Sequence, residues 1–236
     1  MSKYKGQDRF LLAIDCIVFG FDGANIKLLL VHRDIEPEKD KWSLMGGFVH
    51  ADEAPDDAAN RILEELTGLK SVYLEQMQTF GALNRDPVER TFSIAYYALI
   101  DIHKYEQQLS HKHHAEWFLV GDMPDLIFDH NDMVKMAKKR LQYKAALHPI
   151  LFQLLPEKFT IPQLQALYEG IYQSKLDDRN FSRKLLSTGL LIKLPEKEKL
   201  SSKKGAFYYT LDQSHYMENF HSFLNFIPNP DRFFKD

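Results

Sequence analysis

The sequence predicts an α+β protein of two domains. A mixed sheet between helices is expected over residues 1–150, and a smaller helical domain with a hairpin over residues 151–236. Strand and helix patterns alternate through the first part, and after Pro149 the pattern changes to short helices. The charge balance changes at the same place, because residues 1–150 hold 18 Lys and Arg against 23 Asp and Glu, whereas residues 151–236 hold 12 against 10.

Strands and helices of the first domain can be placed in order. The strand patterns lie at 11–21, 26–33, 42–49, 72–80, 91–101 and 115–120. The first two flank an Asp-Gly-Ala-Asn turn and predict a hairpin. Pro55 begins a helix with apolar residues at helical spacing, and Gly68 ends it. A second helix, rich in Lys and Met, is predicted over 131–147.

The second domain begins with a short helix over 151–155. Thr160 is the predicted cap of a helix over 161–172, and Gly189 ends a third helix over 177–187. The last two strand patterns, 190–194 and 206–211, enclose a charged stretch and predict a hairpin.

Composition narrows the class of protein. The chain is 44% hydrophobic and 27% charged, which is ordinary for a soluble globular protein. Cys16 is the only cysteine, so no intrachain disulfide forms, and its apolar neighbours predict a core position. No segment approaches the ~18 uninterrupted apolar residues of a membrane helix, and no signal-peptide pattern is present. We therefore expect a cytoplasmic protein with no membrane partner.

One motif in the first domain resembles the Nudix box. The family pattern is Gly, five residues, Glu, seven residues, then Arg-Glu-apolar-any-Glu-Glu-any-Gly-apolar. The residues in register are Gly47, Glu53, Arg61, Leu63, Glu65, Gly68 and Leu69. The resemblance implies a Nudix fold, which is an α/β/α sandwich around a mixed sheet.

Two carboxylates of this motif are missing, since Ile62 and Leu66 stand at glutamate positions. Positions 62, 65 and 66 share one helix face, where Nudix hydrolases hold Mg²⁺ against a diphosphate. We therefore expect no catalytic residue, no metal and no cofactor. The alternative is a Nudix hydrolase of nucleoside diphosphate derivatives such as ADP-ribose. Its rebuilt metal site would use Glu53, Glu64 or Glu65, with His50.

A domain without catalysis can keep its pocket as an effector site. Polar loop residues and nearby aromatic side chains are the expected ligands: Trp42, Phe48, Arg85, Asp86, Arg90 and Tyr96. Alternatively, Arg85 and Asp86 form a surface ion pair and the aromatic residues belong to the core. For Asp129 and His130, a helix cap is favoured over a pocket edge.

The second domain has the pattern of a winged helix-turn-helix. Apolar residues Phe181, Leu185 and Leu186 are expected to pack the third helix onto the second, which leaves a basic outer face. Arg and Asn on such a face read base edges in the major groove, while Lys and Ser hold phosphates. The expected DNA contacts are Gln163, Lys175, Arg179, Asn180, Ser182, Arg183, Lys184, Ser202, Lys203 and Lys204. A winged helix that binds protein instead is the alternative.

Together, the degenerate Nudix box and the run Asp-Arg-Asn-Phe-Ser-Arg-Lys resemble the Nudix-related transcriptional regulators, the NrtR family. The resemblance implies a homodimeric repressor that binds double-stranded operator DNA under the control of a small-molecule effector. The runs Ser-Leu-Met-Gly-Gly-Phe-Val and Ser-Ile-Ala-Tyr-Tyr-Ala-Leu-Ile are closest to a Bacteroidetes carbohydrate-sensing branch, which includes the arabinose regulator AraR. The expected effector is therefore a pentose such as L-arabinose, with ADP-ribose as the alternative.

Overall fold

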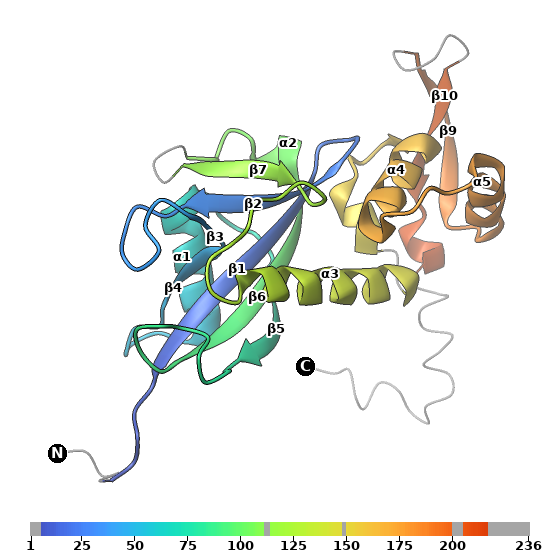
Figure 1. The fold of residues 1–236 in the computed structure, drawn as a ribbon. Helices are drawn as coiled ribbons and strands as arrows, with labels where there is room; N and C mark the ends of the chain where they lie inside the picture. Colours follow the sequence, from blue (N-terminus) through green and yellow to red (C-terminus); the bar gives the residue numbers. More distant parts are fainter. Residues whose placement is uncertain (1–5, 111–113, 148–149, 200–204, 217–236) are drawn as a thin grey trace, which may run out of the picture. The chain divides into compact units, whose positions relative to one another are not determined.

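The computed structural model describes residues 6–110, 114–147, 150–199 and 205–216. The chain divides into two compact units, Met1–Leu154 and Leu155–Asp236 (Figure 1). The division falls a few residues after the interruption at Pro149. None of the helices in the described ranges combines the length and apolar character that a membrane crossing needs.

A mixed sheet forms the centre of the first unit, with strand order β3–β2–β1–β6–β5, while β4 pairs with β1 and β7 with β2. Its strands are β1 Leu11–Phe21, β2 Ile26–His32, β3 Trp42–Ser43, β4 Met45–Phe48, β5 Glu75–Phe80, β6 Thr91–Asp101 and β7 Ala115–Leu119. The β1–β6 pair is parallel, and the other pairs are antiparallel. β1 is the central strand, since it pairs with β2, β4 and β6.

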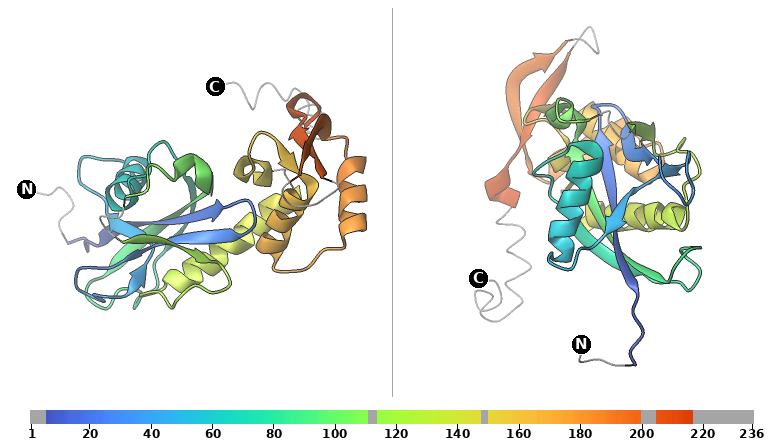
Figure 2. Two further views of the ribbon diagram at one scale, coloured as in Figure 1. Left: turned by 90° about the horizontal axis from the view of Figure 1, so that it is seen from above. Right: turned by 90° about the vertical axis from the view of Figure 1, so that its left-hand side faces the viewer.

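Two helices cover opposite faces of this sheet (Figure 2). α1, Pro55–Thr67, begins with Pro55 and ends at Gly68, whose φ of 80° is the left-handed conformation of a helix C-cap. Ile62 and Leu63 of α1 pack with Ile14 and Cys16 of β1 in one apolar cluster. α3, His130–Leu147, buries Met133, Val134, Ala137, Leu141 and Ala145. Side chains alternate along a strand, so Asp15 lies on the face opposite α1.

The described part of the second unit includes the helices α4 and α5 and a small antiparallel sheet, in strand order β8–β10–β9. Its elements are β8 Phe159–Thr160, α4 Ile161–Tyr172, α5 Asp178–Ser187, β9 Leu191–Glu198 and β10 Ala206–Leu211. Thr160 and Gln163 form a capping box at the start of α4, and Asp177 caps α5 by accepting from Asn180 N at 2.8 Å. The helices predicted over 161–172 and 177–187 are therefore confirmed.

Several elements differ from the sequence prediction. The segment predicted over 42–49 divides into β3 and β4, which pair with β2 and β1, and β9 extends to Glu198. The segment Ile150–Leu154, η2, is a 3-10 helix, and α2, Ile102–Tyr105, was not predicted. β8 was also not predicted, because a strand of two residues has no alternation to detect. Its existence depends on pairing with Tyr208 and Tyr209 of β10.

Candidate functional site

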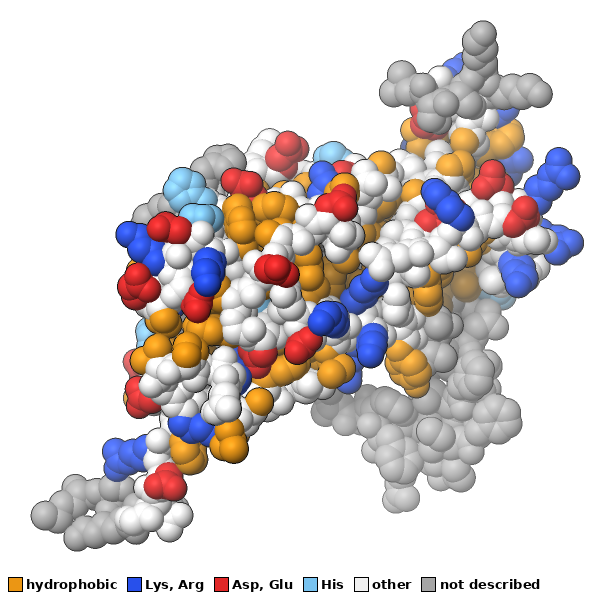
Figure 3. Space-filling model, in the orientation of Figure 1, with side chains coloured by type: hydrophobic (Ala, Val, Ile, Leu, Met, Phe, Trp, Pro, Cys, Tyr) orange, Lys and Arg blue, Asp and Glu red, His pale blue; other side chains and the backbone are white. Residues whose placement is uncertain are grey.

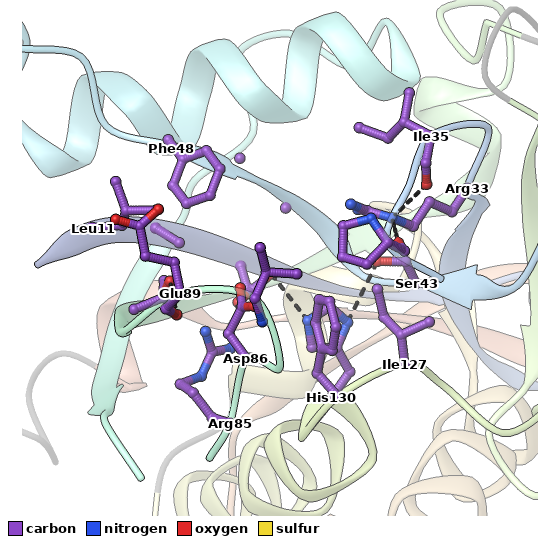
Figure 4. A pocket seen from close by; sticks show the side chains of 18 of the residues that line it. Leu11, Arg33, Ile35, Ser43, Phe48, Arg85, Asp86, Glu89, Ile127 and His130 are labelled. Carbon is purple, nitrogen blue, oxygen red and sulfur yellow. Dashed lines mark hydrogen bonds and ion pairs between the residues drawn. The ribbon is translucent and has the colours of Figure 1, made fainter. Parts of the chain in front are cut away.

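A cavity of about 370 Å³ lies on the face of the first-unit sheet opposite α1. Its walls come from β1, β4 and the connections β2–β3, β5–β6 and β7–α3. Figure 4 shows Arg33, Phe48, Glu89 and His130 around this cavity. Connections from three parts of the chain therefore meet over the central strand.

A buried carboxylate, Asp15 of β1, lies at the floor of the cavity and is 4% exposed. Ser93 Oγ donates to Asp15 Oδ2 at 2.6 Å, and His130 Nε2 lies 3.4 Å from Asp15 Oδ1. Gly46 leaves space for this group, because a Cβ there would lie 2.5 Å from Asp15 Oδ1. A buried charge is costly unless it is paired and hydrogen-bonded, so these contacts make Asp15 tolerable.

Arg85 of the β5–β6 connection is the cation of this group, and its side chain is 3% exposed. It donates to Asp129 through Nε at 3.0 Å and Nη2 at 2.9 Å, and to Asp15 through Nη2 at 3.3 Å. Arg85 therefore joins the central strand to the residue that precedes α3. A two-pronged guanidinium–carboxylate pair of this kind also sets a fixed geometry.

His130, the first residue of α3, is buried and completes the floor. Its Nδ1 accepts from Leu44 N at 3.2 Å, which leaves Nε2 to carry the proton that faces Asp15. Burial is the main cause that lowers the pKa of His130 below its ordinary value. With His130 neutral, the cluster holds two carboxylates, Asp15 and Asp129, and one cation, Arg85, so negative groups outnumber positive ones.

The cavity lining as a whole is acidic. Four carboxylates, Asp15, Glu36, Asp86 and Glu89, face two guanidinium groups. Arg33 is bound to its own loop, donating through Nε to Ile35 O at 3.0 Å and Pro37 O at 2.6 Å. Phe48 adds a half-exposed aromatic ring. The lining thus offers many hydrogen-bond acceptors, one apolar face and little unengaged positive charge.

The opposite face of the sheet holds the degenerate Nudix helix. Ile62 is 2% exposed, and a Cβ at Gly47 would lie 2.9 Å from its Cγ1. Leu66 is partly buried against the same cluster. Glu53 is held by Arg61, whose Nε and Nη2 lie 2.9 and 2.5 Å from its two carboxylate oxygens.

These residues do not fit the Mg²⁺ site of a Nudix hydrolase. The bond from Arg61 lowers the pKa of Glu53 to about 2, so Glu53 is ionised but engaged. Glu65 also pairs with Arg61, at 3.2 Å. In the described part of the chain, no three His, Cys, Asp or Glu side chains are grouped as metal ligands would be. Mg²⁺ needs several oxygen ligands, which this face does not bring together.

In the second unit, α5 presents a basic outer surface. Figure 3 shows Lys and Arg side chains gathered over this helix. Arg179, Asn180, Arg183 and Lys184 are exposed, while Ser182 is half-exposed. Arg183 Nη2 donates to Asn180 Oδ1 at 2.7 Å, so these two side chains act as one unit.

The β9–β10 hairpin carries a second group of cations. The ammonium groups of Lys193 and Lys197 lie 3.7 and 4.3 Å from the centre of the Phe207 ring. Within the described residues, neither lysine has a carboxylate within ion-pair distance. Two cations on one ring, without an anion between them, favour an approaching phosphate.

Comparison with known proteins identifies both units. A model for the NUDIX domain matches residues 9–138, and a model for the NrtR DNA-binding winged helix domain matches residues 151–211. The chain is 33% identical over 220 residues to the ADPR responsive transcriptional repressor NtrR of Acinetobacter baylyi, covering 92% of this chain and 88% of that protein. The chain belongs to the NrtR family. It is a DNA-binding transcriptional regulator with a Nudix domain.

Solved NrtR structures agree with this assignment. Shewanella oneidensis NrtR complexed with a 27mer DNA matches with a TM-score of 0.72 and 28% identity, over 87% of this chain and 95% of that chain. The NUDIX domain of the same protein complexed with ADP ribose matches with a TM-score of 0.50 and 30% identity, over 59% of this chain and 94% of that chain. The family fold predicted from the sequence is therefore confirmed.

Three of the six predicted effector residues line the cavity of this NrtR-family protein: Phe48, Arg85 and Asp86. Trp42, Arg90 and Tyr96 do not line it. Tyr96 is packed in the core against α1, where its OH donates to Asp56. Arg90 donates to the Gly81 and Ala82 carbonyls and stacks over Phe92. Trp42 packs edge-on against Phe118 and His32.

One alternative from the sequence, a surface ion pair of Arg85 with Asp86, is wrong, because the buried guanidinium of Arg85 binds Asp15 and Asp129. His130 lines the cavity, as the pocket alternative expects, and Asp129 directly precedes α3, where its carbonyl accepts from Met133 N at 3.1 Å, as the cap prediction expects. Asp15 and Arg33 also line the cavity, and the sequence analysis names neither of them as a candidate. The available signal was Asp15 itself, an acidic residue in an otherwise apolar strand.

The predicted DNA contacts fall into three groups. Arg179, Asn180, Ser182, Arg183 and Lys184 lie together on α5. Gln163 and Lys175 are engaged within the unit: Gln163 Oε1 accepts from Thr160 N at 2.8 Å, and Lys175 pairs with Glu169 at 2.7 Å. Ser202, Lys203 and Lys204 lie outside the described residues. Leu186, expected to pack on α4, is 46% exposed.

Proposed function

We propose that this NrtR-family regulator senses a neutral polyhydroxylated molecule, a pentose such as L-arabinose, in the cavity on β1, and that the ligand controls operator binding. The acidic lining carries this proposal. Carboxylates and a guanidinium form hydrogen bonds with sugar hydroxyls, and Phe48 offers an apolar face to the sugar ring. A diphosphate would instead meet like charge without a metal ion to screen it.

The degenerate Nudix helix supports the same proposal. With Ile62 and Leu66 at carboxylate positions, the Nudix helix α1 lacks two of the ligands that would hold a metal–diphosphate complex. The runs that resemble the arabinose-regulator branch favour the same ligand class. Hydrolysis is accordingly not proposed, and we expect no turnover of ADP-ribose with Mg²⁺ or Mn²⁺.

ADP-ribose is the second candidate effector, and two observations favour it. The relatives of this protein include an ADPR responsive repressor and a NUDIX domain complexed with ADP ribose. A second cavity of about 580 Å³ shares Arg85 and Phe128 with the first, which would give an extended ligand more room than a pentose needs. Both candidates are compatible with a repressor.

We further propose a homodimer whose two winged helices meet half-sites about 34 Å apart, or multiples of that distance. The effector needs to favour one arrangement by about 1–3 kcal/mol to change operator affinity. α3 precedes the DNA-binding unit in the chain and begins at the pocket residue His130, so it is the element through which we expect ligand binding to act.

A gel shift on the DNA that flanks the gene for this protein tests the proposal, with L-arabinose, D-xylose, ADP-ribose or buffer added. We expect one pentose to change the shift and ADP-ribose to have no effect. A response to ADP-ribose alone would replace the pentose by the second candidate.

A carboxylate variant gives an independent sign test by calorimetry. Glu89→Gln removes one negative charge from the exposed rim of the cavity, and Glu116→Gln removes one from an exposed position on β7 as a control. If the ligand is a pentose, Glu89→Gln should not increase the affinity of the protein for it. Tighter binding of ADP-ribose by Glu89→Gln, absent in Glu116→Gln, would support the diphosphate ligand.

A further inference from the structure

The helix proposed to read DNA is weakly anchored by apolar contacts. None of the side chains of α5 is buried, and Leu186 is 46% exposed. Phe181 contacts Tyr168 of α4 edge-on, with ring centres 5.6 Å apart. Apolar burial by itself therefore provides little to set the orientation of α5 on α4.

A polar network supplies the missing connection. Gln165 of α4 is 9% exposed, and its Nε2 donates to Asp178 Oδ1 at 2.8 Å and to Leu176 O at 3.2 Å. Asp178 is the first residue of α5, and Leu176 lies in the turn before it. A buried amide makes a strong geometric demand, because losing its acceptors leaves a donor unsatisfied.

Glu169 of α4 holds the same turn from the other side. Its Oε1 accepts from Leu176 N at 2.9 Å and from Gln165 Nε2 at 3.3 Å, while Lys175 Nζ donates to its Oε2 at 2.7 Å. The bond from Lys175, and then the one from Leu176 N, lower the pKa of Glu169 to about 2. The carboxylate is therefore ionised at neutral pH.

An acidic side chain in a DNA-binding unit opposes the attraction of phosphate, so its presence beside α5 needs another physical reason. We propose that Gln165 and Glu169 are positioning residues for operator recognition, which hold the α4–α5 turn so that Arg179, Asn180 and Arg183 reach base edges. This inference rests on the proposal that α5 reads DNA, and it is independent of the effector. Lys175, predicted as a DNA contact, belongs to this network.

The test compares two variants with the same change of charge in the full-length protein. Glu169→Gln removes the charge of the network and the carboxylate that pairs with Lys175, whereas Glu196→Gln breaks an exposed ion pair with Lys158 on the hairpin. Affinity is measured for a duplex selected from a random pool by the wild-type protein, and for a scrambled duplex of equal length at equal salt. We expect Glu196→Gln to leave the ratio of the two affinities unchanged. Glu169→Gln should lower this ratio about tenfold, the scale of one lost bidentate base contact.

The contrary result is that Glu169→Gln and Glu196→Gln raise the affinities for the selected and the scrambled duplex by the same factor. Glu169 would then act only through its charge, and the inference would be overturned. Gln165→Met is the second variant, for use if Glu169→Gln does not fold. It keeps the size of the side chain but removes the amide, and it should lower the same ratio of affinities. Arg183→Ala separates the two proposals. If this variant leaves the ratio unchanged, α5 does not read bases, and both the reading role and the positioning inference fail.

Discussion

Replacing Arg85 by methionine is expected to lower the free energy of unfolding of the Nudix domain by about 3–5 kcal/mol, the usual cost of removing one partner from a buried ion pair. The substitution leaves Asp15 and Asp129 without their cation, and the Asp15 side chain is 6% exposed. Urea unfolding followed by tryptophan fluorescence measures this domain separately, because both tryptophans, Trp42 and Trp117, lie in the first unit.

Arg90→Met is the matched control for this measurement. Arg90 lies five residues further along the same connection and donates to backbone carbonyls rather than to carboxylates. Its loss is expected to cost about 0.5–1.5 kcal/mol, as for an ordinary hydrogen bond. Equal costs for the two variants would contradict the role assigned to the buried cluster. In a double-mutant cycle, Asp15→Asn should recover part of the loss caused by Arg85→Met, because it removes the uncompensated charge.

Arg183→Ala is expected to weaken binding to the specific operator by about 1–3 kcal/mol, because it removes a base contact and also frees Asn180 from its hydrogen bond. Binding to unrelated DNA should change much less. Arg179→Ala is expected to behave in the same way. Fluorescence anisotropy with specific and scrambled duplexes at several salt concentrations separates these effects.

Lys193→Ala is the comparison for this prediction, since Lys193 lies on the hairpin and binds no base in the proposed arrangement. It should weaken binding to all sequences alike and reduce the dependence of log affinity on log salt by about one. If Arg183→Ala showed this uniform pattern instead, Arg183 would be a phosphate contact and α5 would not carry the specificity.

Some features of this protein follow from local sequence alone. The start of α4 at Thr160 and the end of α1 at Gly68 depend on hydrogen bonds and backbone conformation within a few residues, so the sequence predicts them. The same is true of the loss of metal ligands, because Ile62 and Leu66 lie on one helix face at any orientation of that helix.

The pocket, in contrast, was decided by tertiary structure. Alternation along β6 shows that Tyr96 and Ser93 point to opposite faces, but it does not show which face carries the cavity. Tyr96 lies on the face that packs against α1, while Asp15, Arg85 and His130 come together on the other face from positions up to 115 residues apart. Their meeting depends on strand register and on the packing of α3, which are interactions between distant parts of the chain. Local sequence preferences do not predict such contacts, and only the folded sheet brings these charged side chains together at the floor of the cavity.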